Sequence, residues 1–308
     1  MVKTLSSEQA AAARAYLTRA ARPLEAARYR YHFEGGSAGD VLAALAQFRN
    51  EEGGFGNALE PDLRTPASSA LAASVALQIA AEVRAPADHP IVAGAVAYLL
   101  ASYDAATRRW RIIPDEAEHS AHAFWWAADG LDARFGDFWV NPRAELVGYL
   151  WRYAGAERAT WLHATTAALL GELAESPAAL AGNDLLCAMR LATTPQLPAG
   201  LRQSLQARVR ADMVQAVETD PGRWGEYVLR PLEVALAPDS PFADLFPDAI
   251  QANLDYLVET QGVDGAWSPV WSWAPLDAAA WAQAEGEWKS VLTLAALREL
   301  VAWGRIAA

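Results

Sequence analysis

The sequence predicts an all-α protein. Alternating runs of β-branched and aromatic residues, which indicate strands, hardly occur, whereas alanine and leucine recur at helical spacing along nearly the whole chain. Hydrophobic residues make up 53% of the 308 residues, which is enough to bury a sizeable core. No long linker or low-complexity tract interrupts the helical pattern. We therefore expect one helical domain over residues 1–308.

Capping signals and prolines indicate where the helices begin. Ser6 and Gln9 have the spacing of a capping box, and the alanine-rich run after them should end at Pro23. Thr65 can cap a third helix, and Pro66 suits its first position. This third helix is small and apolar nearly all round, so we expect burial on every side. The expected helices after the first cover residues 39–49, 66–83, 88–103, 119–129, 141–153, 158–175, 179–192, 200–218, 226–236, 246–260 and 284–302, which makes about twelve helices, or about six hairpins.

A loop that contains glycine and an aromatic residue recurs after helical stretches. We call these segments the glycine–aromatic loops; they comprise residues 47–56, 220–224 and 261–267, together with a weaker copy at 103–110 that has the aromatic residues but no glycine. A glutamine near a helix end can donate hydrogen bonds to free carbonyls, Asp-Gly turns the chain with glycine at positive φ, and the aromatic ring packs on the next helix. A degenerate repeat of this kind is typical of circular or stacked repeat folds.

Two of these loops resemble motifs of known families. Residues 261–267 are similar to the Gln-x-x-Asp-Gly-x-Trp repeat of squalene and oxidosqualene cyclases, and residues 47–55, which end in Gly-Gly-Phe, resemble the repeat of protein prenyltransferase β subunits. The resemblance implies the α/α toroid of the terpenoid cyclase and prenyltransferase superfamily, a barrel of inner and outer helices. Gly-Gly-Phe-Gly, Leu-Glu-Pro-Asp and Glu-Trp-Lys also resemble a group of bacterial toroid proteins, a likeness that implies no particular activity.

Charge and cysteine content exclude several partners. The formal net charge of −12 would repel a nucleic-acid backbone or an anionic lipid surface, and no dense Lys/Arg run offsets it. Cys187 is the only cysteine, so no intramolecular disulfide can form, and the polar N-terminal start does not resemble a signal segment. The most apolar stretches fall short of the roughly 20 residues that span a bilayer. We expect a cytoplasmic protein without a membrane span.

The densest group of charged residues precedes the third helix. Glu60, Asp62 and Arg64 lie just before a helix N-terminus, where the dipole favours a carboxylate and a second acid raises the pKa of its neighbour. Resemblance to class II terpene cyclases, whose acid belongs to an Asp-x-Asp-Asp motif, implies catalytic roles for Asp62 and Glu60, although Leu63 replaces the third acid. The alternative is an ion pair between Asp62 and Arg64 that secures the start of the helix.

Two further groups could hold a metal. Prenyltransferases bind zinc through Asp, Cys and His, but no histidine accompanies Asp184 and Cys187, so a buried structural cysteine is the better interpretation. Protein farnesylation and an α-subunit partner are therefore disfavoured. His119 and His122 have i, i+3 spacing, yet no remote third ligand can be identified. We predict no metal and no cofactor.

The thirteen tryptophans suggest a site near the loops, where aromatic faces can stabilise carbocations or stack on sugar rings, although most of them should be structural. The candidate ligand-binding residues are Phe55, Arg64, His119, His122, Trp125, Trp126, Trp224, Asp264, Trp267 and Trp271.

Three functions fit these observations. The first is acid-initiated cyclisation or isomerisation of an isoprenoid by Asp62. The second is a carbohydrate-active lyase or hydrolase, in which Glu60 or Asp62 faces another carboxylate such as Asp115 or Asp264. The third is a non-catalytic small-molecule-binding or scaffold protein. The expected partner is a small molecule, an isoprenoid or a sugar.

Overall fold

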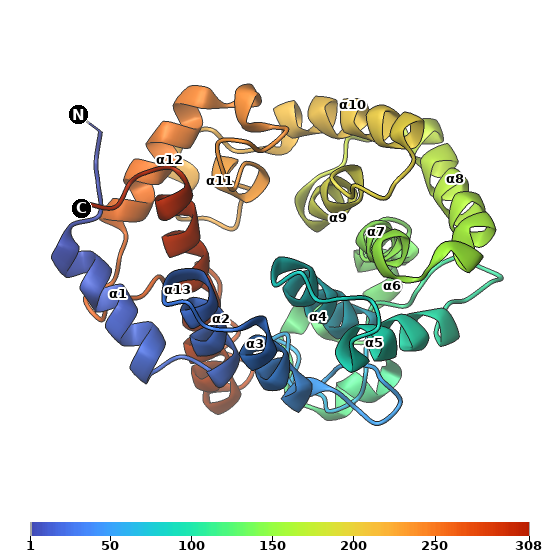
Figure 1. Ribbon diagram of the computed structural model, residues 1–308, viewed down its shortest axis with the longest axis horizontal. Coiled ribbons are helices and arrows are strands. Elements are labelled where there is room, and N and C mark those ends of the chain that lie inside the picture. The colour runs from blue at the N-terminus through green and yellow to red at the C-terminus, as the bar shows by residue number, and fades with distance from the viewer. Residues whose placement is uncertain (1, 308) are drawn as a thin grey trace. The chain divides into compact units, whose positions relative to one another are not determined.

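The computed structural model describes residues 2–307, which form an all-helical protein (Figure 1). These residues contain thirteen α-helices and short 3₁₀ turns, and their only β-type pairing is a set of isolated bridges. The prediction of an all-α protein is confirmed. Among residues 2–307, no helix combines the length and the apolar character needed to cross a membrane.

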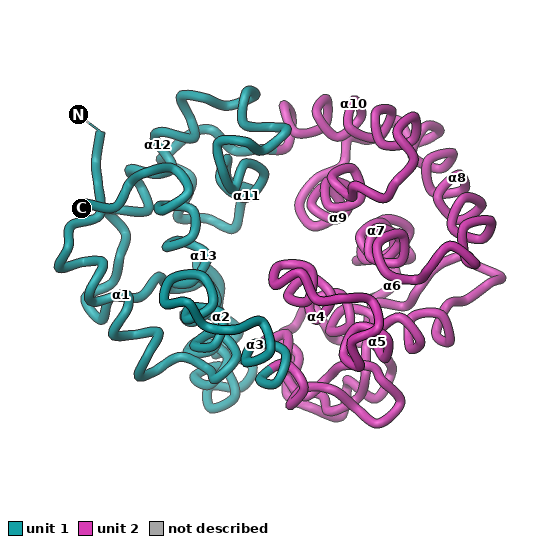
Figure 2. Tube along the Cα trace, in the orientation of Figure 1, with its two compact units in different colours: residues 1–44, 217–308 teal, residues 45–216 magenta. Residues whose placement is uncertain are grey.

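The chain divides into two compact units (Figure 2). That these units form one domain over residues 1–308 stays a prediction. Unit 1 comprises residues 1–44 and 217–308, and unit 2 comprises residues 45–216. The helices of unit 1 are α1 (Ser7–Arg19), α2 (Pro23–Phe33), α3 (Ala38–Leu45, which ends at the boundary), α11 (Pro231–Val234), α12 (Pro247–Glu259) and α13 (Ala278–Ala302). The helices of unit 2 are α4 (Ala70–Glu82), α5 (Pro90–Ala101), α6 (Leu131–Arg134), α7 (Arg143–Tyr153), α8 (Ala159–Glu175), α9 (Gly182–Ala192) and α10 (Ala199–Ala216).

Unit 2 is built from three consecutive hairpins. Helices α4, α7 and α9 form one layer, and their partners α5, α8 and α10 form the other (Figure 2). Helix α4 is alanine-rich, which lets its neighbours approach closely, and Ala73, Ala76 and Leu77 are buried. Most sides of the helix are buried as expected, whereas the face with Leu71, Val75 and Gln78 is half-buried.

In unit 1, the two ends of the chain lie together. The backbone N–H of Leu5 donates to the carbonyl of Arg305 (2.8 Å), and that of Ala307 donates to Leu5 (2.9 Å). Helix α1 follows directly and packs on α2 and α13. The predicted capping box is present, since Gln9 N–H donates to Ser6 Oγ (3.2 Å) and Ser6 N–H donates to Gln9 Oε1 (3.0 Å).

The glycine–aromatic loops join helix ends through their tryptophans. In three of them the indole N–H donates to a carbonyl at or just after the end of the preceding helix, and all three rings are buried. The pairs are Trp110 with Leu99 (2.7 Å), Trp224 with Glu218 (2.9 Å) and Trp267 with Leu257 (2.9 Å).

Two glutamines behave differently in these loops. The Gln261 amide donates to the carbonyls of Gly265 and Gln9, both at 2.9 Å, and Gly265 has the expected positive φ of 85°. Gln47 in the first copy is exposed, and that loop is closed by the bridge between Arg49 and Phe55 instead. In the loop at 261–267, Gly265 and Trp267 thus behave as predicted, whereas Gln261 bonds within the loop and to α1 instead of the carbonyls that end α12.

Several helix boundaries differ from the sequence prediction because of local caps. Helix α1 ends at Arg19, before Pro23, and Pro23 starts α2, a helix that was not predicted although proline suits the first helical position. Helix α4 begins at Ala70, because Ser69 Oγ accepts the N–H of Ala72 (3.0 Å), whereas Thr65 forms a turn with the N–H of Ala67 (3.2 Å). Helix α13 begins at 278 rather than 284, and the helix expected at 226–236 is reduced to 231–234.

The helix predicted at residues 119–129 is wrong. The segment instead contains 3₁₀ turns at Asp115–His119 and Phe124–Trp126. Between these turns the backbone pairs with residues 62–64, and this pairing takes up the hydrogen-bonding groups that a helix would have used.

Candidate functional site in unit 2

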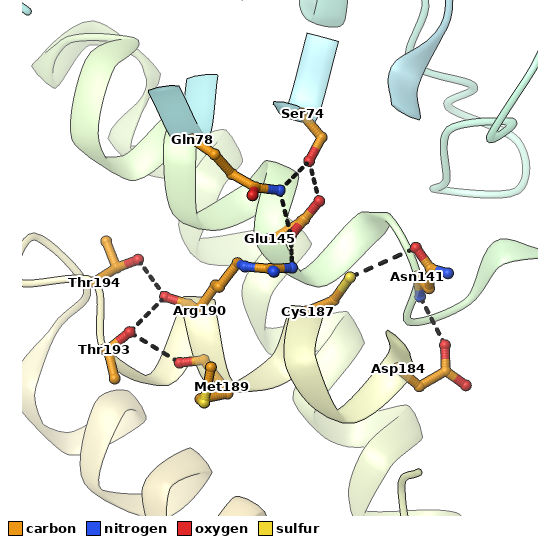
Figure 3. Close-up of polar contacts among 10 residues, drawn as sticks. All are labelled: Ser74, Gln78, Asn141, Glu145, Asp184, Cys187, Met189, Arg190, Thr193 and Thr194. Carbon is orange, nitrogen blue, oxygen red and sulfur yellow. Dashed lines mark hydrogen bonds and ion pairs between the residues drawn. The ribbon is translucent and has the colours of Figure 1, made fainter. Parts of the chain in front are cut away.

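An ion pair between a buried carboxylate and a partly exposed arginine joins the three helices of one layer of unit 2. Glu145 on α7 is 4% exposed, and its Oε2 lies 2.6 Å from Nη1 of Arg190 on α9 (Figure 3). From α4, Ser74 Oγ donates to Oε1 of the same carboxylate, and Gln78 Nε2 lies 3.5 Å from Oε2. Helices α4 and α9, which are distant in sequence, thus place three polar side chains around one carboxylate of α7.

Local sequence explains how each helix contributes. Ser74 and Gln78 are four residues apart, so they share one face of α4. Glu145 lies in the first turn of α7, where the helix dipole favours a negative charge. Arg190 projects from α9, in which Leu185, Cys187, Ala188 and Leu191 are buried.

Glu145 holds Arg190 in place, but most of the N–H donors of its guanidinium have no acceptor in the part of the chain that the structure describes. Burial lowers the pKa of its guanidinium, but Glu145, Cys187 and Tyr149 together raise the pKa by more than burial lowers it, so the group stays charged. Its side chain is 33% exposed, and only Nη1 has a hydrogen-bond acceptor among residues 2–307. A guanidinium carries five N–H donors in a planar fork. Arg190 therefore presents donors that an additional acceptor could use.

The neighbouring thiol and phenol are neutral. Burial raises the pKa of the Cys187 thiol well above its usual value, and the Glu145 charge adds to this effect. The pKa of Tyr149 is raised for the same two reasons. A neutral thiol is a poor nucleophile, so Cys187 is structural, as the sequence predicted.

Asn141 connects α7 to α9 beside the thiol. Its Oδ1 accepts from Cys187 Sγ (3.5 Å), and its backbone N–H donates to Asp184 Oδ1 (3.1 Å) (Figure 3). Within residues 2–307 no three His, Cys, Asp or Glu side chains are grouped so that they could hold a metal ion.

The acidic loop predicted from the sequence lies in unit 2 as well. Asp62 is 2% exposed, and its carbonyl accepts the N–H of Ala123 (2.9 Å), while Arg64 N–H donates to the carbonyl of Ala121 (3.0 Å). Leu63 forms the isolated bridge with His122 between these two bonds. The structure thus brings the Asp62–Arg64 segment next to the His122 segment.

The other candidates in unit 2 occupy different environments. His122 Nδ1 lies 2.6 Å from the carbonyl of Ser120, whereas His119 is exposed. Trp126 is buried and stacks on Phe135, with the ring centroids 5.0 Å apart. The remaining ones are Phe55, which is fully buried, and Glu60 and Trp125, which are half-buried.

The candidates in unit 1 are mainly tied to structural contacts. The indoles of Trp224 and Trp267 bond the helix-end carbonyls described above. Asp264 forms an ion pair with Lys289. Trp271 packs edge-on against Trp288, with centroids 5.1 Å apart.

Sequence reasoning missed the ion pair at Glu145 and Arg190. One signal was present, because Ser74 and Gln78 interrupt a helix that is otherwise apolar on all sides, and a polar residue buried in such a helix needs a partner. The partners come from helices that are remote in sequence, and neither the sequence period nor a motif identifies them.

Comparison of the chain with protein-family models, with curated proteins and with solved structures gave no match. The site is therefore interpreted from its own geometry.

Proposed function

We propose that this protein binds a small organic molecule that carries a carboxylate or hydroxyl group, and that Arg190 receives this group. The observation that supports the proposal is the partly exposed guanidinium of Arg190, which Glu145 holds by a 2.6 Å contact while its other donors have no acceptor among residues 2–307. The planar guanidinium of an arginine is suited to binding a carboxylate through two parallel hydrogen bonds.

A purely structural role explains this arrangement less well. Burying a charged pair costs desolvation energy that is often not recovered, and apolar residues of similar size would stabilise the layer as much or more. A guanidinium held in one orientation, in contrast, loses little side-chain entropy when a ligand binds, which favours affinity.

Arg190→Lys tests this proposal, because lysine keeps the positive charge beside Glu145 but removes the planar fork. Thermal unfolding should be measured with acetate, succinate, citrate, benzoate and glycerol at constant ionic strength. We expect at least one of these to stabilise the wild-type chain and to bind Arg190→Lys at least about tenfold more weakly, because a bidentate hydrogen bond is lost.

Arg202→Lys is the matched control, since Arg202 donates to the backbone carbonyls of Pro195 and Leu197 and does not contact Glu145. Its ligand response should equal that of the wild type. The proposal fails if none of the compounds stabilises the wild type, or if both lysine variants bind equally well.

We also propose that the helices close into an α/α toroid. The support is local: unit 2 has three hairpins with α4, α7 and α9 in one layer, and the glycine–aromatic loops recur in both units. A crystal structure of the chain would test the closure.

Acid-initiated chemistry on an isoprenoid is the second candidate function. It is favoured by Asp62, which is 2% exposed and lies in a loop bonded to the His122 segment, because a positioned carboxyl group can serve as a general acid. Incubation with linear isoprenoids and their diphosphates, followed by product analysis, should show turnover by the wild type. Asp62→Asn should lower the rate by roughly a hundredfold or more, as expected for loss of a general acid.

Asp132→Asn, which changes an exposed carboxylate, should keep full activity. Absence of any product with the wild type, or equal rates for the wild type and Asp62→Asn, would exclude this chemistry.

A further inference from the structure

Three arginines converge on one carboxylate in unit 2. Glu172 on α8 lies 2.8 Å from Arg143, the first residue of α7, and 3.5 Å from Arg109 in the loop after α5. Arg108, the neighbour of Arg109, lies 3.9 Å from the other oxygen of Glu172. We call these four residues the arginine cluster.

The positive charge of the arginine cluster is not balanced. Three guanidinium groups share one carboxylate, and the further acceptors are backbone carbonyls, those of Asp137 for Arg109 (2.9 Å) and of Trp139 for Arg143 (3.4 Å). A local excess of about two positive charges is unusual in a chain whose formal net charge is −12.

Buried donors in the cluster lack acceptors. Arg143 is fully buried, and its Nε and Nη2 have no hydrogen-bond partner among residues 2–307; the same holds for Nε of Arg109. Buried polar groups in folded proteins are nearly always hydrogen-bonded, and a buried charge without compensation is costly. These buried donors are therefore able to bond an additional acceptor.

The cluster is accessible from solvent on one side. The side chain of Arg108 is 58% exposed, and those of Arg109 and Glu172 are 26% and 25% exposed. An anion can therefore reach Arg108 and Arg109 directly. An anion bound at Arg108 and Arg109 also attracts the buried guanidinium of Arg143, because the protein interior between them has a low effective dielectric constant.

We propose that the arginine cluster is an oxyanion-binding site for a phosphate-type group. A phosphate monoester carries about two negative charges at neutral pH and several strong acceptor oxygens, which match the excess charge and the planar donors of Arg108 and Arg109. The anion competes with Glu172 for these guanidinium groups. This site is separate from the one proposed at Arg190, and neither proposal depends on the other.

Calorimetric titration of the full chain with sodium phosphate tests the site, with sodium chloride at equal ionic strength as the reference. We expect heat of binding with phosphate only. Arg108→Gln should weaken phosphate binding roughly fivefold, as for loss of one partly exposed charge contact. Glu172→Gln should strengthen it by at least a similar factor, because the competing carboxylate is removed.

Arg223→Gln is the matched control, because Arg223 is similarly exposed but is balanced by Glu218 and Glu226. It should bind phosphate like the wild type. If Glu172→Gln destabilises the fold, phosphate should restore its unfolding temperature, which a purely structural Glu172 would not allow.

Titration with glycerol 3-phosphate distinguishes the source of the group. Tighter binding than inorganic phosphate assigns the site to an organic phosphate, and equal or weaker binding assigns it to the free ion. The proposal is overturned if phosphate gives no more heat than chloride, if Arg108→Gln and Arg223→Gln bind equally, or if Glu172→Gln weakens binding.

Discussion

Glu299→Gln is expected to remove a large loss of stability that the wild-type chain shows between about pH 5 and pH 9. Desolvation of the half-buried Glu299 side chain in α13 raises its pKa from 4.5 to about 8; the charges of Arg230 and Arg298 lower the pKa, and Glu233 raises it further. The folded state therefore holds this proton more tightly than the unfolded state does.

The sign follows from linkage. Stability from neutral Glu299 is fully present below the unfolded pKa of 4.5, falls as the pH rises, and is lost above the folded pKa of about 8. One pKa unit corresponds to about 1.4 kcal/mol, so the wild type should lose on the order of 3–5 kcal/mol relative to Glu299→Gln. Denaturant unfolding of both proteins at pH 5, 7 and 9 measures the difference.

Glu285→Gln, a change in the same helix, should retain the wild-type pH dependence and serves as the control. Parallel pH profiles for the wild type and Glu299→Gln would show that Glu299 ionises at its ordinary pKa in the folded protein.

Glu145→Ala should destabilise the ligand-free protein by roughly 3–5 kcal/mol, because it leaves Arg190 without its counter-charge and removes the acceptor of Ser74 and Gln78. The loss is far larger than that expected for an exposed ion pair. Chemical denaturation at neutral pH measures it.

A double substitution separates the contribution of the ion pair to stability from that of side-chain packing. Replacing both Glu145 and Arg190 with methionine removes the two charges together, so most of the loss should be recovered. Glu226→Ala, which breaks an exposed pair with Arg223, should cost less than about 1 kcal/mol. If Glu145→Ala costs no more than this control, the buried pair does not hold the layer together.

Much of the fold could be predicted from the sequence because its signals are local. The capping box at Ser6 and Gln9 correctly located α1, and alanine and leucine periodicity located α5 and α7 to α10 within a few residues. The loop at 261–267 was also predicted, since Trp267 reaches a carbonyl only ten residues before it.

The predicted helix boundaries are wrong where a residue type can either end or begin a helix, and where segments distant in sequence pair with each other. Pro23 predicts the end of a helix, yet in the structure it starts α2. The helix expected at residues 119–129 is absent because residues 121–123 hydrogen-bond to residues 62–64. No local propensity contains that information.

The candidate sites show the same division. The sequence by itself determined the helical class, the capping box of α1, the loop at 261–267 and the place of the acidic segment at Asp62, because each depends on residues within about ten positions of one another. Only the tertiary structure decided that Glu145 would meet Ser74, 71 residues away, and Arg190, 45 residues away. Contacts across such separations depend on how α4, α7 and α9 pack, and helix packing is a property of the assembled layer rather than of any one segment.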